Sequence, residues 1–211
     1  KPKDGVNVSV MHINLSMKKD GKNIFYDPDG EKGLSREAFY FIGGLMAHAP
    51  GMTAITNPLV NSYKRLVPGY EAPVYIAWST VNRSPLIRIP TTRGEGTMIE
   101  LRSPDPSANP YLALAVCLRA GLSGIRCKIE PPEAVSGNLM EMTDEEKGKA
   151  SVTSLPGSLM EAVEAMERDD FIREALGEHI YSKYVNAKKK EYLEYCAVVT
   201  QWELDQYLYR I

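Results

Sequence analysis

Apolar and polar residues alternate over residues 8–17, which is the pattern of a strand with one face on a core. One face would carry Ile13, Leu15 and Met17, and the other His12, Asn14 and Ser16. Apolar stretches at residues 74–80, 86–89 and 97–102 predict further strands. The residues that share a polar face in the last strand are Met98, Glu100 and Arg102. The pattern therefore predicts a sheet with one polar face.

Helix signals stand between these predicted strands. Ser35 is a candidate N-cap for a helix that ends near His48, because Pro50 with the glycine after it would stop the helix there. Asn57 followed by proline repeats the start signal and predicts a short helix that carries residues 61–65. We expect both helices to lie among the strands.

The second half of the chain is predicted to be helical. Asn109, with proline after it, opens a buried helix over residues 111–120. Ser158 and Glu161 form a capping box for a helix to about Arg168, and the next helix is expected to start at Asp169 or Asp170. Each of these helix starts is predicted from a few side chains that are close together in the sequence.

Two further segments complete the helical half. Proline, glycine and acidic residues at 130–144 predict an exposed connection or flap. Apolar and aromatic residues recur every three or four positions over residues 179–209, which predicts one long amphipathic helix. We expect the aromatic side chains of Trp202, Tyr207 and Tyr209 to pack.

The order of elements, strands first and helices after, predicts an α+β fold. We expect a strand-rich part over residues 1–105 and a helical part over residues 106–211. The 211 residues, 44% hydrophobic and 25% charged, are enough to bury a core in one or two domains.

Composition excludes several kinds of partner. A net charge of −2 with mixed signs indicates no nucleic-acid partner, and the lack of a long apolar run indicates no membrane span. Cys117, Cys127 and Cys196 cannot all pair and show no CxxC spacing, so reduced thiols in the cytoplasm are expected. Because Lys1 stands where methionine would start a protein, we expect a piece of a longer polypeptide.

Charged residues are dense between positions 61 and 102, and most such residues are solvated surface. Here Arg88, Glu100 and Arg102 lie on predicted strands whose other face is apolar, and Glu71 lies on the loop of residues 68–73. Converging guanidinium groups would suit a substrate that carries carboxylate and phosphate groups. The residues concerned are Arg65, Glu71, Arg83, Arg88, Glu100 and Arg102.

His12 and Glu100 could share a divalent cation. A strand histidine is more often a structural residue with a hydrogen-bond partner, and two ligands are too few for Mg²⁺ or Mn²⁺. Other carboxylates would therefore have to come from elsewhere in the protein.

Three ordered segments carry a resemblance to a known family. They read NPLVNSYKRLVPGYEAP at residues 57–73, NRSPLIRIP at 82–90 and IELRSPDPSANPYLA at 99–113. Together they closely resemble bacterial class I glutamine synthetases, and the likeness continues weakly along the helical tail. Short motifs arise by chance, whereas three long segments in the family's order do not.

The resemblance implies the carboxy-terminal portion of a catalytic domain, without the amino-terminal domain. Its fold would be half of the glutamine synthetase/guanido kinase-like fold, an antiparallel curved sheet followed by helices. The implied reaction joins ammonium to L-glutamate through a γ-glutamyl phosphate, with ATP and Mg²⁺ or Mn²⁺. The implied assembly is a cytoplasmic homo-oligomer, a dodecamer, and we expect residues 1–211 alone to be inactive.

The resemblance also assigns roles to matched residues. The metal ligands would be His12 and Glu100. The nucleotide would contact Asn14, Leu15, Ser16, Arg83 and Arg88. Glutamate would contact Asn7, Val8, Arg65, Glu71, Arg83 and Arg102. The catalytic residues would be Glu71, Arg83 and Arg88, with Glu71 as the flap carboxylate that takes a proton from ammonium and excludes water.

Some positions depart from the family pattern. Val8 and Val10 stand where the family has glycine, so a Cβ would reshape the glutamate end of the pocket. Met98 replaces a basic residue, and residues 138–141 lack the tyrosine that some relatives carry for adenylylation. Two alternatives stay open: a ligase that joins glutamate to a polyamine or other amine, and an inactive scaffold.

Overall fold

A mixed sheet forms the centre of the fold in the computed structural model, which describes residues 9–68 and 72–208. The sheet has five strands in the order β1-β6-β5-β4-β7, and a two-stranded hairpin, β2-β3, lies beyond β1. The main strands are β1 (Ile13–Leu15), β4 (Tyr75–Ser79), β5 (Pro85–Arg88), β6 (Ile99–Leu101) and β7 (Thr153–Ser154). The hairpin strands are β2 (Lys18–Lys19) and β3 (Lys22–Asn23), and 3₁₀ turns occur at Glu31–Gly33 and Gly94–Gly96.

The sheet is not wholly antiparallel, so the prediction of an antiparallel sheet is wrong for one pair of strands. β4 and β5 run parallel, with a register shift between Tyr75 and Trp78. Residues 80–84 alone connect the two strands, whereas a parallel crossover ordinarily takes a dozen residues or more. The alternation of a strand reports which face is buried and carries no information about strand direction.

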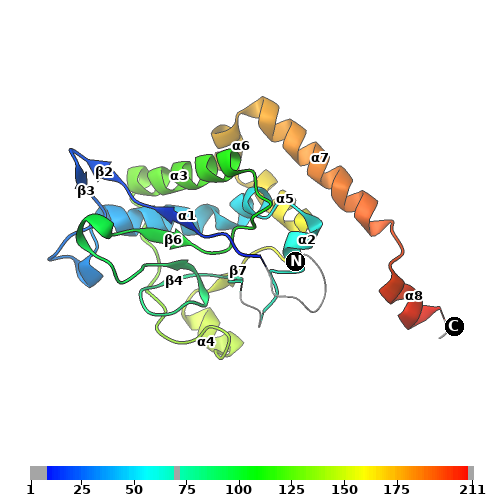
Figure 1. The fold of residues 1–211 in the computed structure, drawn as a ribbon, viewed down its shortest axis with the longest axis horizontal. Helices are drawn as coiled ribbons and strands as arrows, with labels where there is room; N and C mark the ends of the chain where they lie inside the picture. The colour runs from blue at the N-terminus through cyan, green and yellow to red at the C-terminus, as the bar shows by residue number, and fades with distance from the viewer. Residues whose placement is uncertain (1–8, 69–71, 209–211) are drawn as a thin grey trace.

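Helices cover one side of the sheet (Figure 1). The central helix is α1 (Arg36–Thr56), which packs against α3 (Pro110–Cys127), α5 (Leu159–Arg168) and β4. Glycines let α1 and α3 approach closely: a Cβ on Gly44 would lie 2.2 Å from the carbonyl oxygen of Ala120, and one on Gly124 would lie 2.0 Å from that of Tyr40. The two backbones therefore meet without intervening side chains.

Helix α1 continues past its predicted end near His48 and runs through Pro50 to Thr56. Proline inside a helix removes a hydrogen bond and costs roughly 3 kcal/mol. Every residue from Gly51 to Thr56 is buried, so core packing offsets that cost. Local helix propensity does not include this contribution of core packing, so it predicted the end of the helix too early.

The predicted helix starts are confirmed at four places, the first of which is Ser35, the N-cap of α1. Asn109 accepts hydrogen bonds from two backbone amides of α3, Ser158 caps α5, and Asp169 caps α6 (Asp170–Leu176). The predicted short helix forms as α2 (Val60–Tyr63), but its N-cap is Leu59 and not Asn57, and it ends before Arg65. Helix α4 (Asp144–Lys149) follows the segment of residues 130–144. That segment is not uniformly exposed, since the side chains of Val135 and Leu139 are buried.

The tail forms two helices, not the single long helix that was predicted. Helix α7 (Glu178–Cys196) ends, and Thr200 starts α8 (Gln201–Tyr207) with a capping box closed by Glu203. The aromatic rings of Trp202 and Tyr207 contact each other edge to face at 5.8 Å but remain 63% and 54% exposed. The two rings thus pack against each other and not into the core, and Tyr209 lies outside the described residues.

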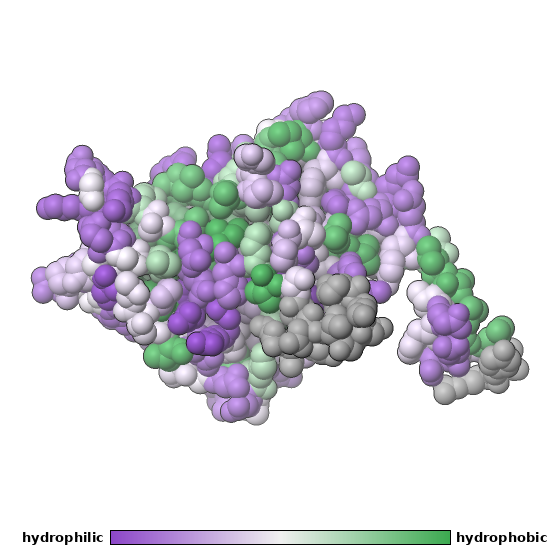
Figure 2. Space-filling view, viewed as in Figure 1, coloured by the Kyte–Doolittle hydropathy of each residue, from purple (hydrophilic) through white to green (hydrophobic). Residues whose placement is uncertain are grey.

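This arm of α7 and α8 extends away from the body of the molecule, and Figure 2 shows apolar side chains exposed along it. Val198 and Val199 are 60% and 67% exposed.

No helix within the described residues is both long enough and apolar enough to span a membrane.

Candidate active site

Three neighbouring strands bring polar side chains to one face of the sheet. Glu100 on β6 is the register partner of Asn14 on β1 and of Arg88 on β5. Residues directly opposite each other on paired strands point to the same face, so the three side chains form a row across the sheet. The predicted alternation on β1 is confirmed, because Ile13 is buried while His12 and Asn14 are exposed.

The carboxylate of Glu100 lies at the centre of a charged cluster. Its Oε1 is 2.7 Å from Nδ1 of His12, and its Oε2 accepts hydrogen bonds of 3.2 Å from Nη1 of both Arg88 and Arg102. Glu100 is only 7% exposed, and a carboxylate this buried needs such partners. Two guanidinium groups against one carboxylate leave the cluster positive, which favours an anionic ligand.

The surroundings of His12 favour the neutral form of its imidazole. Burial lowers the pKa of the His12 imidazole, and the positive charge of Arg102 lowers it further. The negative charge of Glu100 and its hydrogen bond raise this pKa, but the net shift is downward. A neutral imidazole is the form that binds metal ions.

A cavity of about 580 Å³ opens beside the cluster. Its lining joins residues that precede β1, the β4–β5 connection, the residue that follows β6 and the segment after α3. The lining residues are Val10, His12, Asn82, Arg83, Ser84, Arg102, Asn138 and Met140. The structure thus brings together His12, Arg83 and Arg102, three of the residues predicted from sequence. The exposed side chain of Arg83 makes no hydrogen bond or ion pair with any residue in the described ranges.

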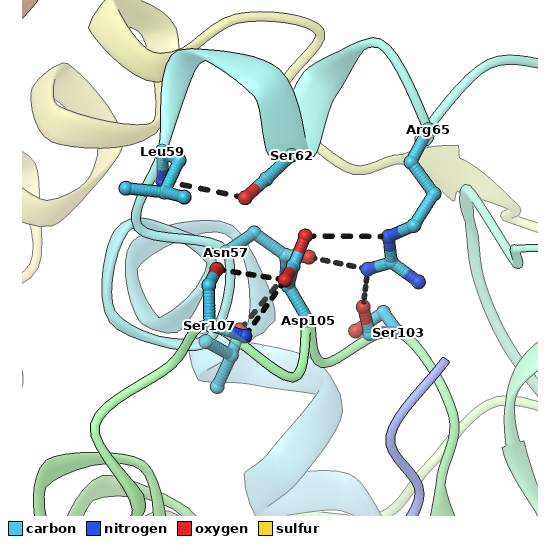
Figure 3. A network of polar contacts seen from close by, with 8 residues as sticks. Asn57, Leu59, Ser62, Arg65, Ser103, Asp105 and Ser107 are labelled. Carbon is cyan, nitrogen blue, oxygen red and sulfur yellow. Dashed lines mark hydrogen bonds and ion pairs between the residues drawn. The ribbon is translucent and has the colours of Figure 1, made fainter. Parts of the chain in front are cut away.

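Arg65 lies in a different polar network (Figure 3). Its guanidinium is fully buried, and its Nη2 donates to Oδ1 of Asn57 at 2.6 Å and to the carbonyl oxygen of Ser103. Its Nε is 3.7 Å from Oδ2 of Asp105. Arg65 is not among the residues that line the cavity, and its contact with glutamate stays a prediction.

Asp105 is a residue of this network that the sequence analysis did not single out. Its Oδ1 accepts hydrogen bonds from the backbone N–H and the hydroxyl of Ser107, at 2.9 and 2.7 Å. Burial raises the pKa of the Asp105 carboxyl, but these bonds, one from Ser62 and the charge of Arg65 together lower it. The Asp-Pro-Ser sequence, which favours an Asx turn, was the available signal.

The remaining predicted residues fall outside the cavity lining or outside the described ranges. Leu15 is half-buried and pairs with Ile99, and Ser16 after it is exposed. Asn7, Val8 and Glu71 lie outside the described residues. Their roles, like the nucleotide contacts of residues 14–16, stay predictions.

The donor set for a metal ion is partial. His12 and Glu100 offer a nitrogen and an oxygen 2.7 Å apart at the cavity. Within the described residues, no three His, Cys, Asp or Glu side chains form a group that could hold a metal ion. Mg²⁺ is usually bound through one or two carboxylates together with water and substrate phosphates, so His12 and Glu100 fit as part of a donor set that further ligands would complete.

Comparison with known proteins identifies the relatives of this chain. Residues 1–207 match the family described as glutamine synthetase, catalytic domain. Glutamine synthetase of Methanosarcina mazei is 59% identical over 208 residues, which are 99% of this chain and 46% of the relative. Glutamine synthetase of Thermotoga maritima is 57% identical over 209 residues, 99% of this chain and 48% of the relative. The chain thus spans about half the length of the curated relatives it matches.

Solved structures agree with these matches. The structure titled "Apo GmaS without ligand" superposes with a TM-score of 0.86 at 37% identity, over 99% of this chain and 47% of that chain. The structure titled "GmaS/ADP complex-Conformation 1" gives a TM-score of 0.83 at 37% identity, over 95% of this chain and 46% of that chain. The predicted α+β fold class is confirmed. The chain belongs to the glutamine synthetase catalytic-domain family.

Proposed function

We propose that the protein containing this chain joins ammonia to L-glutamate, using ATP to form a γ-glutamyl phosphate. The observation that carries the proposal is the Glu100 carboxylate held by His12, Arg88 and Arg102 beside the cavity. Membership of the family and relatives named glutamine synthetase support the same reaction. A positive, partly enclosed site suits substrates that carry carboxylate and phosphate groups.

The arginines of the cavity would act on negative charge. Arg83 and Arg102 line the cavity, and their guanidinium groups would bind the carboxylates of glutamate or the transferring phosphoryl group. Arg88 would stabilise the leaving ADP. Such groups accelerate phosphoryl transfer because they are already oriented when charge develops in the transition state.

His12 and Glu100 would hold a divalent cation, Mg²⁺ or Mn²⁺, where ATP phosphates complete its coordination. When bound, such a cation offsets the charge that builds up between the β- and γ-phosphates. The lowered pKa of His12 supports this role, because the neutral ring has a lone pair for the metal at physiological pH. Asn14, Leu15 and Ser16 would contact the nucleotide farther along β1.

The remaining roles rest on the family resemblance alone. Glu71 would take the proton from ammonium and help to exclude water from the acyl phosphate. Asn7, Val8 and Arg65 would contact glutamate. Arg65 and Glu71 lie in a segment that closely resembles the family, Asn7 matches a glutamate-contacting position, and Val8 stands where the family has glycine. Each assignment is open to substitution and kinetic analysis.

Assembly and location belong to the same proposal. We expect a homo-oligomer, a dodecamer by family resemblance, and the apolar side chains exposed on α7 and α8 support self-association. Cytoplasmic location is supported by Cys117, Cys127 and Cys196, which are free thiols.

The proposal is tested by measuring phosphate release from ATP with glutamate and ammonia, and separately with glutamate and putrescine. The full polypeptide that contains residues 1–211 is the enzyme to assay. Faster release with ammonia is the expected result. Preference for putrescine would assign an amine ligase instead, and no release with either nucleophile would favour a scaffold. Residues 1–211 alone are expected to show no turnover.

A further inference from the structure

The β4–β5 connection carries Arg83, and side chains fix its shape. Oγ of Ser79, the last residue of β4, accepts hydrogen bonds from the backbone N–H groups of Val81 and Asn82, at 3.2 and 3.0 Å. Oδ1 of Asn82 accepts from the N–H of Ser84 at 2.9 Å. These bonds turn the chain on either side of Arg83. They allow so short a connection to join two parallel strands.

The same connection is joined to a segment distant in sequence. Nδ2 of Asn82 donates to the carbonyl oxygen of Gly137 at 2.5 Å, and the N–H of Leu139 donates to Oγ of Ser84 at 3.2 Å. These two bonds lie immediately before and after Arg83. Each spans 55 residues of sequence, so neither belongs to the turn itself.

The partner segment is anchored in turn. The Leu139 side chain is fully buried and packs with Ala77 of β4 and with Val135. The N–H of Val135 donates to the carbonyl oxygen of Trp78 at 2.9 Å. Residues 135–139 therefore lie along β4 as a fixed support, and the connection is attached to this support.

Both sides of the attachment line the candidate cavity. Asn82, Arg83 and Ser84 contribute from the connection, and Asn138 and Met140 contribute from the supporting segment. Arg83 lies between the two attached residues, and its own exposed side chain has no partner within the described ranges. Its backbone is thus fixed while its guanidinium stays available to a ligand.

We propose that Asn82 and Ser84 are positioning residues for Arg83, which hold its guanidinium at the cavity by attaching its backbone to residues 137–139. The inference rests on the proposed function, because Arg83 is taken to contact substrate. Displacement of a catalytic group by about 1 Å can cost on the order of 100-fold in rate. Loss of either bond is therefore expected to lower turnover although neither side chain needs to touch the substrate.

Two substitutions, Ser84→Ala and Asn82→Asp, remove the hydrogen bonds to residues 137–139 and keep those within the β4–β5 connection. Ser84→Ala removes the acceptor for the Leu139 N–H, and Ser84→Thr keeps an Oγ in its place. Asn82→Asp keeps the oxygen that accepts from Ser84 but replaces the donor to Gly137 with a second oxygen. Ser136→Ala is the matched control, because this exposed serine lies in the supporting segment and outside both bonds.

The test is a double-mutant cycle with Arg83→Gln in the full polypeptide that contains residues 1–211, read as phosphate release with glutamate and ammonia. Ser84→Ala and Asn82→Asp are each expected to lower kcat about 10- to 100-fold with little change in the Kd for ATP. Ser84→Thr should restore most of the rate, and Ser136→Ala should leave it unchanged. In the Arg83→Gln background, the two attachment substitutions should have almost no further effect.

The possible results distinguish the inference from the proposal on which it rests. If Arg83→Gln alone leaves phosphate release unchanged, the proposed role of Arg83 fails. If Arg83→Gln lowers the rate but Ser84→Ala and Asn82→Asp do not, only the positioning inference fails. Equal losses in both backgrounds, or a loss explained entirely by a lower melting temperature in both variants, would also overturn the inference.

Discussion

At the scale of single residues, Glu100 controls how charge is distributed beside the cavity. One carboxylate holds an imidazole through one oxygen and two guanidinium groups through the other. Each partner comes from a different place on the sheet, so Glu100 also fixes the orientation of His12, Arg88 and Arg102. A ligand that binds between His12 and Glu100, in place of their hydrogen bond, would contact side chains whose orientation is already fixed.

Replacing Glu100 with Gln should disrupt both catalysis and metal binding. The substitution removes the carboxylate that these three partners share, and loss of a group that supports a metal typically costs 10–100-fold in affinity or activity. We expect Glu100→Gln to raise the Mn²⁺ concentration needed for half-maximal phosphate release by about that factor. Glu145→Gln is the control, because that carboxylate is exposed on α4. Unchanged metal dependence in Glu100→Gln would remove Glu100 from the metal site.

Asp105 should contribute stability that depends on pH. Its pKa is lower in the folded protein than in the unfolded chain, so its contribution is complete above the unfolded pKa and is lost as pH falls through the folded value. Asp105→Asn removes the charge beside buried Arg65, and we expect a loss of about 1–3 kcal/mol at pH 7. Urea unfolding of both proteins measures this difference.

The difference between wild type and Asp105→Asn should shrink as the pH is lowered through the folded pKa of Asp105, since protonation then removes the charge in the wild type as well. Asp20→Asn is a suitable control, because Asp20 is exposed and Asn tolerates its positive φ of 51°. A difference that stays constant as the pH falls would show that shape, not charge, explains the effect.

At the scale of elements, features that depend on neighbouring residues were predicted correctly. The direction of strand pairing, which depends on contacts distant in sequence, was not. The caps at Asn109, Ser158 and Asp169 each depend on side chains within a few residues, and all three were predicted. The parallel pairing of β4 with β5 depends on contacts that no local pattern reports. The continuation of α1 through Pro50 likewise depends on burial against other helices.

The same distinction applies to the candidate site. Alternation along each strand predicted that His12 and Glu100 lie on the polar faces of their own strands. The network of Arg65 and Asp105 was missed, because its ion pair joins residues from different parts of the chain. The support that residues 135–139 give to Arg83 was also missed, since proline and glycine in that region indicated only an exposed connection.

The contact between α1 and α3 should tolerate no side chain at its glycines. Gly44→Ala would place a Cβ 2.2 Å from the Ala120 carbonyl oxygen, so we expect a loss of about 1–3 kcal/mol or more in unfolding free energy. Gly148→Ala on α4 is the matched control, because a Cβ there meets nothing within 4 Å. The control should gain roughly 0.5–1 kcal/mol from helix propensity. Equal effects in urea unfolding would contradict the close packing of the two helices.

At the scale of the whole molecule, the arm formed by α7 and α8 is the part least supported by the body (Figure 1). An apolar surface that stays exposed on a chain with its own core is typical of an interface. The cavity and the arm lie on different elements.

Val199→Asp should weaken self-association without unfolding the subunit. Val199 is 67% exposed between α7 and α8, so a charge there costs little in the monomer but opposes burial in an assembly. Sedimentation of the full polypeptide should show a smaller species at equal concentration. Lys190→Gln, at a side chain 77% exposed on α7, should leave assembly unchanged. If Val199→Asp also leaves it unchanged, the arm is not the interface.

The most direct test of a shared metal site is anomalous scattering from crystals of the full polypeptide grown with Mn²⁺ and a nonhydrolysable ATP analogue. We expect a Mn²⁺ peak at about 2 Å from both the His12 imidazole and the Glu100 carboxylate, with analogue phosphates on its open side. A Mn²⁺ peak elsewhere, with the hydrogen bond between His12 and Glu100 intact, would contradict the metal site and the phosphoryl-transfer role built on it.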